Sequence, residues 1–286
     1  MDGQQYSRNA ELKPGMLFPE GMHRIALGVE YLGSAYQGFQ KQQTAPNTVQ
    51  AELEAAISSV ANEPVTLVCA GRTDAGVHAS GQVIHFDTLS LRPAKAWVQG
   101  VNTHLPDDIR IHWSLDTGPT FHARFSAVSR TYRFVFSSSP VRSAVMQKMV
   151  TWTGYPLDAR LMNDAVQRLL GEHDFSAFRA AQCQAHSPVR ELQAAKVVEV
   201  GQFVVLEVRA NAFLHHMVRN IAGSLQLVGR GLRPVDWLDE LLAGRDRTLA
   251  APTAHPHGLF LTRVEYPQGF GIPSLSMGPA FLPEVI

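Results

Sequence analysis

Residues 70–78 read Ala-Gly-Arg-Thr-Asp-Ala-Gly-Val-His, and this short stretch holds the most informative chemistry in the chain. It follows an apolar, β-branched run over 65–70 and precedes a strand-like pattern over 82–86, so we expect a loop between two strands. Its two glycines allow a tight turn and the close approach of a ligand. Asp74, beside the opposite charge of Arg72, could act as a nucleophile or base. The alternative is an Asp that caps the turn and pairs with Arg72.

Outward from this loop, strand and helix patterns follow one another without strict alternation. Thr48 stands where a helix N-cap is expected, because the apolar stripe that starts at Val49 has helical spacing. Such an order predicts an α+β fold with a largely antiparallel sheet, not a doubly wound one. The other expected helices cover 93–104, 161–170, 213–228 and 234–242, and the other expected strands cover 25–31, 109–115, 130–136, 197–200, 203–208 and 259–266.

The chain length of 286 residues suits one large domain or two moderate ones. Gly118-Pro119 interrupts the pattern and marks the expected boundary. The prediction is an N-terminal extension (1–22), an N-terminal α+β domain with the Asp74 loop (23–118) and a C-terminal α+β domain (119–286).

Composition and the N-terminus limit where the protein works. Hydrophobic residues make up 45% and charged residues 17%, as in a globular protein with a substantial core. The first twenty residues hold no apolar core of a signal peptide, and no apolar run is long enough to span a membrane. We therefore expect a cytoplasmic protein without a membrane partner. In that compartment Cys69 and Cys183 are expected to be free thiols.

The net charge of zero argues against a nucleic-acid partner, but the distribution of charge argues for one. Twenty of the 25 basic residues are Arg, whose planar group suits phosphates and bases. No acidic residue occurs between Asp116 and Asp158. A solvated basic surface is the alternative to a binding site. The basic residues of this acid-free stretch are Arg124, Arg130, Arg133, Arg142 and Lys148.

Tyr132 lies within the acid-free stretch, between Arg130 and Arg133. An aromatic ring flanked by guanidinium groups suits the stacking of a base and the binding of its phosphates. The alternative is a core position, since Tyr132, Phe134 and Phe136 share one face of the expected strand.

A second candidate segment is Asn211-Ala-Phe-Leu-His-His-Met-Val-Arg-Asn220. On a helix, its buried stripe would leave His215 and Arg219 on a common neighbouring face. Arg219 could then hold a phosphate or pair with a carboxylate across a cleft. A surface Arg beside a satisfied His is the alternative.

Other cofactor and catalytic patterns are weak or missing. His215-His216 and His255-Pro-His257 hint at a metal, but adjacent histidines on a helix point in different directions, and no spaced ligand set accompanies them. We predict no metal. Without GxGxxG or a P-loop, no nucleotide cofactor is expected, and no GxSxG nucleophile motif occurs.

The sequence resembles the tRNA pseudouridine synthase A family over roughly residues 25–266 and again at Met277-Gly-Pro. One departure is Leu32, where many members carry Asp. The matching segments are Tyr31-Leu-Gly-Ser-Ala-Tyr-Gln-Gly-Phe-Gln40, Gly71-Arg-Thr-Asp-Ala-Gly-Val-His-Ala79, Gly81-Gln-Val-Ile-His-Phe86, Phe121-His-Ala-Arg-Phe-Ser126, Gly171-Glu-His-Asp-Phe-Ser176, 211–220 and Gly258-Leu-Phe-Leu261.

The resemblance implies two α+β domains with mainly antiparallel sheets, joined across a central cleft and assembled as a homodimer that tRNA bridges. It implies an isomerase that converts uridine to pseudouridine at positions 38, 39 and 40 of the tRNA anticodon arm, without a cofactor. The implied catalytic residues are Asp74 (nucleophile), Arg72, Tyr132 and Arg219, and the expected substrate contacts are Tyr132, Leu259, Arg124, Arg130 and His215.

In this reaction Tyr132 would stack on the uracil and remove a proton from C5, which requires a lowered pKa of its phenol. Two other functions are open. A tRNA-folding helper would need the basic surface but not Asp74. A hydrolase with an aspartyl nucleophile would need a metal or a second acid or base near the loop, and the sequence offers neither.

Overall fold

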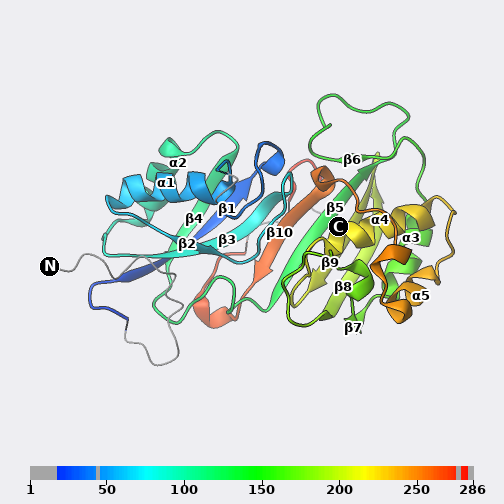
Figure 1. Ribbon diagram of the computed structural model, residues 1–286. Helices are drawn as coiled ribbons and strands as arrows, with labels where there is room; N and C mark the ends of the chain where they lie inside the picture. The colour runs from blue at the N-terminus through cyan, green and yellow to red at the C-terminus, as the bar shows by residue number, and fades with distance from the viewer. Residues whose placement is uncertain (1–17, 43–45, 275–277, 283–286) are drawn as a thin grey trace.

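The computed structural model describes residues 18–42, 46–274 and 278–282, so most of the predicted extension, and Met277 of the tail, lie outside the described part. Ten strands form one sheet in the order β4-β1-β3-β10-β5-β9-β8-β7, with β2 beside β3 and β6 beside β5 (Figure 1). The strands are β1 (His23–Tyr31), β2 (Leu67–Cys69), β3 (His78–Thr88), β4 (Ile109–Asp116), β5 (Ser129–Ser137), β6 (Thr151–Trp152), β7 (Gly171–Asp174), β8 (Val189–Val200), β9 (Phe203–Ala210) and β10 (Leu259–Glu265).

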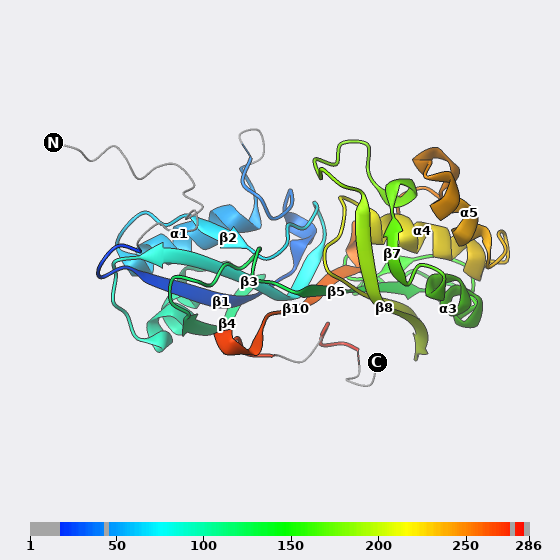
Figure 2. The same cartoon turned by 90° about the horizontal axis from the view of Figure 1, so that it is seen from below.

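The helices gather at the two ends of this long sheet. Figures 1 and 2 show α1 at the end formed by β1 to β4, and α3, α4 and α5 at the end formed by β7 to β9. The helices are α1 (Val49–Ala61), the π-helical turn Ala96–Gly100 that continues into α2 (Val101–His104), α3 (Ala159–Gln167), α4 (Met217–Gly229) and α5 (Trp237–Gly244). Together with the sheet they confirm the α+β class.

The two ends meet where β10 pairs with β3. This pairing is parallel and short, with Phe260 opposite His78 and Leu261 opposite Ala79. On its other edge β10 pairs antiparallel with β5. The strands of the N-terminal and C-terminal parts thus form one continuous sheet, which is antiparallel except at β3–β10 and β5–β6. The division of the chain at residue 118 stays a prediction.

Local sequence signals explain several elements. The Thr48 hydroxyl accepts a hydrogen bond from the Ala51 amide at 3.3 Å, which confirms the predicted N-cap of α1. The β8–β9 hairpin turns at Gly201, whose φ of +58° favours glycine. Every residue of β5 is buried, as expected for a strand in the middle of a sheet. Within the described residues, every helix is too short or too polar to cross a membrane.

The predicted helix over 213–228 is wrong at its start, because α4 begins only at Met217. His216 has a φ of +61°, in the left-handed region, so the backbone before Met217 cannot continue the helix. The prediction also missed the short strands β6 and β7. Strands of two to four residues are too short to show a hydrophobic period in the sequence.

Candidate active site

The loop that carries Asp74 is fixed on both sides of this residue. The Tyr31 hydroxyl lies 2.7 Å from Thr73 Oγ1, and the Phe39 amide donates to the Thr73 carbonyl at 3.0 Å. On the other side, the Val77 amide donates to the Asp74 carbonyl at 3.1 Å. Because its backbone is held by strand β1 and its neighbours, Asp74 is presented in one position.

Two buried side chains of β3 support the ends of the same loop. The Gln82 amide group accepts from the Gly71 N–H at 3.3 Å and donates to the Gly71 carbonyl at 2.7 Å. His78 Nδ1 accepts from the Gly33 amide at 3.0 Å, so its Nε2 carries the proton and donates to the His257 carbonyl at 3.1 Å. Burial lowers the pKa of His78 to about 4, which keeps this imidazole neutral.

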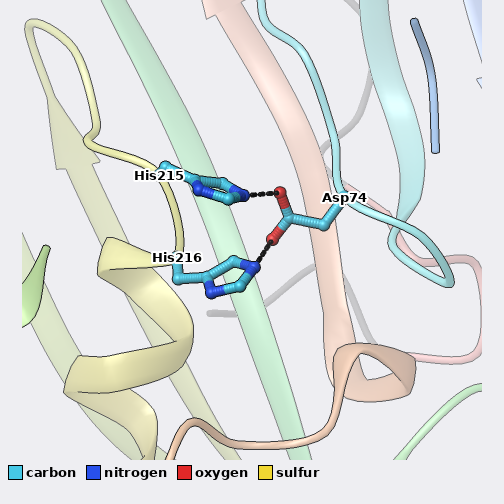
Figure 3. Close-up of side chains that lie close together, drawn as sticks. All are labelled: Asp74, His215 and His216. Carbon is cyan, nitrogen blue, oxygen red and sulfur yellow. Dashed lines mark ion pairs between the residues drawn. The ribbon is translucent and has the colours of Figure 1, made fainter. Parts of the chain in front are cut away.

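Three side chains from the far part of the chain surround the Asp74 carboxylate. Arg219 Nη1 donates to Oδ2 at 3.2 Å, while Arg219 Nε is anchored on the Ala254 carbonyl at 2.9 Å. His215 Nε2 lies 3.4 Å from Oδ1, and His216 Nε2 lies 3.4 Å from Oδ2 (Figure 3). The Asp74 side chain is only 23% exposed, so these charges interact in partly desolvated surroundings.

His215 and His216 reach Asp74 because they are not on a helix. Both precede α4, and the left-handed backbone of His216 turns the two rings toward the same carboxylate, with centroids 4.0 Å apart. The expectation that adjacent histidines point in different directions is therefore wrong here. Burial lowers the pKa of His216. The negative charge of Asp74 acts against this shift and the positive charge of Arg219 adds to it, and the imidazole is neutral near pH 7.

Arg72 does not pair with Asp74 as the sequence suggested. Its side chain is exposed, and within the described part of the chain no ion pair joins it to Asp74. Two residues apart on an irregular loop, the two side chains diverge. The cationic partner of Asp74 is Arg219, and Arg72 is left facing solvent at the site, where its role as a catalytic residue stays a prediction.

Tyr132 lies beside the loop but inside strand β5. Its hydroxyl would be 3.6 Å from a Cβ built on Gly71, and its ring meets Phe213 edge to face, with centroids 5.1 Å apart. Burial raises the pKa of Tyr132, and the charge of Asp74 raises it further. The lowered pKa that the acid–base role required is thus absent in the free protein, where the phenol is protonated.

The Arg130 side chain is buried beneath the site and does not line its surface. It is 9% exposed, and Nη1 donates to the carbonyls of Asn211 at 2.9 Å and Ala127 at 3.2 Å. Nη2 donates to the carbonyls of Ala70 at 3.1 Å and Arg124 at 2.6 Å. These four bonds tie the Asp74 loop to the segment before His215. They favour a positioning role over the predicted substrate contact, because both terminal nitrogens already have acceptors.

The other predicted contacts are divided between core and surface. Leu259 is buried at the start of β10, opposite Phe134 of β5. Arg124 is exposed, and its guanidinium lies 5.3 Å from the centroid of the exposed Phe125 ring. Arg124 thus remains available to a ligand. Its role, and that of Leu259 in a uracil pocket, stay predictions.

Sequence reasoning missed His216 and Phe213 as neighbours of the site. The only available signal was the His215-His216 pair itself, and reading it on a helix separated the two rings. The edge-to-face contact of Phe213 with Tyr132 arises from tertiary packing, for which no spacing in the sequence provides a sign. As a possible metal-ligand set, Asp74, His215 and His216 each offer one donor atom, all within 4.8 Å of one another.

Comparison with known proteins identifies the family. A family model described as tRNA pseudouridine synthase matches residues 28–126 and 165–267, which contain Asp74 and Arg219 respectively. Proteins named tRNA pseudouridine synthase A are 52% identical in Pseudomonas aeruginosa (93% of this chain and 94% of the relative) and 54% identical in Actinobacillus succinogenes (91% and 98%). One from an Enterobacter species is 51% identical (96% and 98%).

The chain is a pseudouridine synthase by class, and hence an isomerase. Within that class it belongs to the tRNA pseudouridine synthase family, as the resemblance of its motifs implied. The solved structure titled "Crystal Structure of a Cbf5-Nop10-Gar1 Complex" also matches, at 13% identity and a TM-score of 0.32 over 83% of this chain and 48% of that one. This similarity is too weak to bear on fold or function.

Proposed function

We propose that the protein isomerises uridine to pseudouridine at positions 38, 39 and 40 in the anticodon arm of tRNA, with Asp74 as the catalytic carboxylate. The observation that carries this proposal is the Asp74 carboxylate, held on a fixed loop and contacted by Arg219 at 3.2 Å. Loop and arginine come from the two segments that match the family model. The contact between them orients the Asp74 carboxylate for use as a nucleophile.

The proposed reaction breaks the N1 glycosidic bond, turns the uracil and rejoins it through C5. No atom is lost, so the protein needs to supply only positioning, charge and a proton transfer. The target base first leaves its stack, at a cost of about a few kcal/mol. Asp74 then starts cleavage, either by attack or by abstraction of a sugar proton, while Arg219 orients the carboxylate.

We assign the transfer of the C5 proton to Tyr132. The negative charge of Asp74 is one cause of the raised pKa of Tyr132. When Asp74 loses its charge in a bond to the substrate or to a proton, this cause disappears, and the phenol can give its own proton to the uracil anion that cleavage releases. The resulting phenolate would then accept the C5 proton after the base has been rejoined. Tyr132 would thus change its acidity during the reaction without moving.

Contact with tRNA is proposed for the acid-free stretch. Arg124, Arg142 and Lys148 are exposed. The pKa of His257 is lowered by burial and by the positive charges of residues that include Arg142, Lys148 and Arg219. Positive charge therefore lies near His257, which is close to Gly76 of the Asp74 loop, and it favours a polyanion there. A homodimer would place two such surfaces on one tRNA, so that weak contacts act together.

The decisive experiment uses an unmodified tRNA transcript with uridines at positions 38, 39 and 40. Pseudouridine is mapped by carbodiimide labelling and primer extension after incubation with wild type, Asp74→Asn and the control Asp164→Asn, whose carboxyl is exposed far along the chain. We expect product at those positions with wild type and Asp164→Asn and none with Asp74→Asn. Binding of tRNA without product from wild type would instead support the folding-helper function.

A further inference from the structure

We propose that Asp74, His215 and His216 form a binding site for a zinc-like divalent cation, and that the ion inhibits the enzyme by occupying its carboxylate. The binding of the ion does not depend on the proposed function, whereas its inhibitory effect rests on it. The ion would act as an inhibitor, because it would bind the carboxylate oxygens that Asp74 uses in the proposed reaction.

The three donor atoms lie within 4.8 Å of one another, which is close to the spacing that zinc needs. Two imidazole nitrogens and a carboxylate are ordinary zinc ligands, at about 2.0–2.2 Å from the ion. In a tetrahedron of that size, neighbouring ligand atoms are about 3.3–3.5 Å apart. The Asp74 oxygens lie 3.4 Å from His215 Nε2 and 3.4 Å from His216 Nε2 (Figure 3). These two distances involve different oxygens of the carboxylate, so binding one ion would require side-chain rotations that draw the three donors together.

Hydrogen bonds fix the main chain at both histidines before any ion arrives. The His215 carbonyl accepts from the Ala180 amide at 3.0 Å, and the His216 carbonyl accepts from the Asn220 amide at 2.9 Å. The positive φ of His216 is a conformation that few residues other than glycine adopt, and it is what aims both rings at Asp74. Such preorganisation lowers the entropic cost of binding.

Arg219 competes with the ion. Its Nη1 lies 3.2 Å from Asp74 Oδ2, the oxygen that also faces His216. A divalent cation would take over the carboxylate from the guanidinium, which remains anchored by Nε on the Ala254 carbonyl. The carboxylate lone pairs would then be bound to metal, and Asp74 could neither attack carbon nor accept a proton.

Binding is tested on the tRNA-free protein by competition for Zn²⁺ with a fluorescent chelator. We expect one ion per chain in wild type, and a loss of at least about tenfold in affinity in His215→Gln, His216→Gln and Asp74→Asn. The exposed His186→Gln and the thiol variant Cys183→Ser should bind as wild type does. Wild-type affinity in both active-site histidine variants, or loss of binding in Cys183→Ser, would overturn the site.

Arg219→Gln separates a metal site from general damage. It removes the competing cation and should strengthen Zn²⁺ binding several-fold, in the direction opposite to the histidine variants. Weaker binding by Arg219→Gln, with its thermal unfolding unchanged, would contradict the competition.

Inhibition is measured on wild type with and without Zn²⁺, followed by chelator. We expect turnover to fall as the site fills and to return when the ion is removed. Turnover that persists with the site filled would overturn the inhibitory role. No pseudouridine in metal-free wild type would refute the proposed function and leave the binding result intact.

Discussion

At the scale of single residues, the site depends on how little freedom its charged groups have. Arg130 gives its donors to four carbonyls, His78 bridges two loops, and Asp74 meets Arg219 in partly buried surroundings. Residue type alone could nominate Asp74 and Arg219. It could not separate Arg130, which is bound by the protein, from Arg124, which is open to a ligand, because this difference lies in tertiary contacts.

Tyr132→Phe tests the proton transfer. The change removes only the hydroxyl and keeps the ring that packs on Phe213, so binding of tRNA should be nearly unchanged. We expect turnover to fall by about 10²–10⁴-fold, the usual contribution of a positioned acid or base. Single-turnover rates and tRNA affinity are to be measured together. Full turnover would leave Tyr132 with stacking alone.

His78 should make the fold sensitive to mild acid. Its pKa is about 4 in the folded protein and about 6.5 in the unfolded chain. Between these two pH values the imidazole is protonated in the unfolded chain and neutral in the folded protein. Stability is thus lost as pH falls from about 6.5 to about 4. Between pH 7 and 5 we expect a loss of about 2 kcal/mol from this group.

Urea unfolding at the two pH values checks the role of His78, with His78→Asn as the comparison. The variant should be less stable at pH 7 but lose less on acidification than wild type does. His85, which burial also protects from protonation, with a pKa of about 2, stays in both proteins and contributes equally. The same loss on acidification in both proteins would exclude His78 as a source.

At the scale of elements, α4 links the buried core to the site. Its first turn carries Arg219, and the next residue, Asn220, is wholly buried. The Asn220 amide group donates to the Phe178 carbonyl at 2.7 Å and accepts from Arg247 at 3.0 Å and Thr253 at 2.7 Å. This network fixes the helix start and the segment that anchors Arg219.

Asn220→Ala should cost about 2–3 kcal/mol of stability, because it leaves several buried polar partners unsatisfied. Ser224→Ala is the matched control on the same buried face, since among the described residues its hydroxyl bonds to the Asn220 carbonyl within the helix and to no other group. We expect a loss below about 1 kcal/mol there. Thermal and urea unfolding measure the stability of both variants. Equal losses of stability would argue against a special role of the Asn220 network.

The sequence predicted the elements that bury one face and are long enough to show a repeating apolar pattern. The stripe of α1 with its Thr48 cap, the alternation of β1 and β4, and the β8–β9 hairpin were all visible in the sequence. The start of α4 was not, because apolar spacing continues through Phe213 and Leu214 while the backbone turns at His216. A single positive φ is set by tertiary context and leaves no periodic trace.

At the scale of the whole molecule, a close approach of two strands joins the ends of the sheet. A Cβ added to Gly81 of β3 would lie 2.1 Å from the Thr262 carbonyl oxygen of β10, so only glycine fits there. On one side of this junction stands the Asp74 loop, and on the other the strands that support α4. The geometry of the site therefore depends on a contact that contains none of its residues.

Gly81→Ala should force β3 and β10 apart, with a loss of about 1–3 kcal/mol in stability and a drop in turnover beyond what unfolding explains. Gly100→Ala is the control, because its Cβ would meet Val60 at an ordinary 3.5 Å within a helical segment. The control should be neutral or slightly stabilising. Turnover in the folded fraction of Gly81→Ala equal to that of wild type would show that the junction tolerates the shift.

The position of β10 in the chain determines when the site can exist during synthesis. This strand, Leu259–Glu265, is the last of the ten to be made, yet it lies between β3 and β5. A nascent chain that has not yet released it can form local hairpins on either side, but Asp74 and Arg219 have no shared sheet to bring them together. The pairing that joins the Asp74 loop to the part of the sheet beside α4 can therefore form only after β10 has been synthesised.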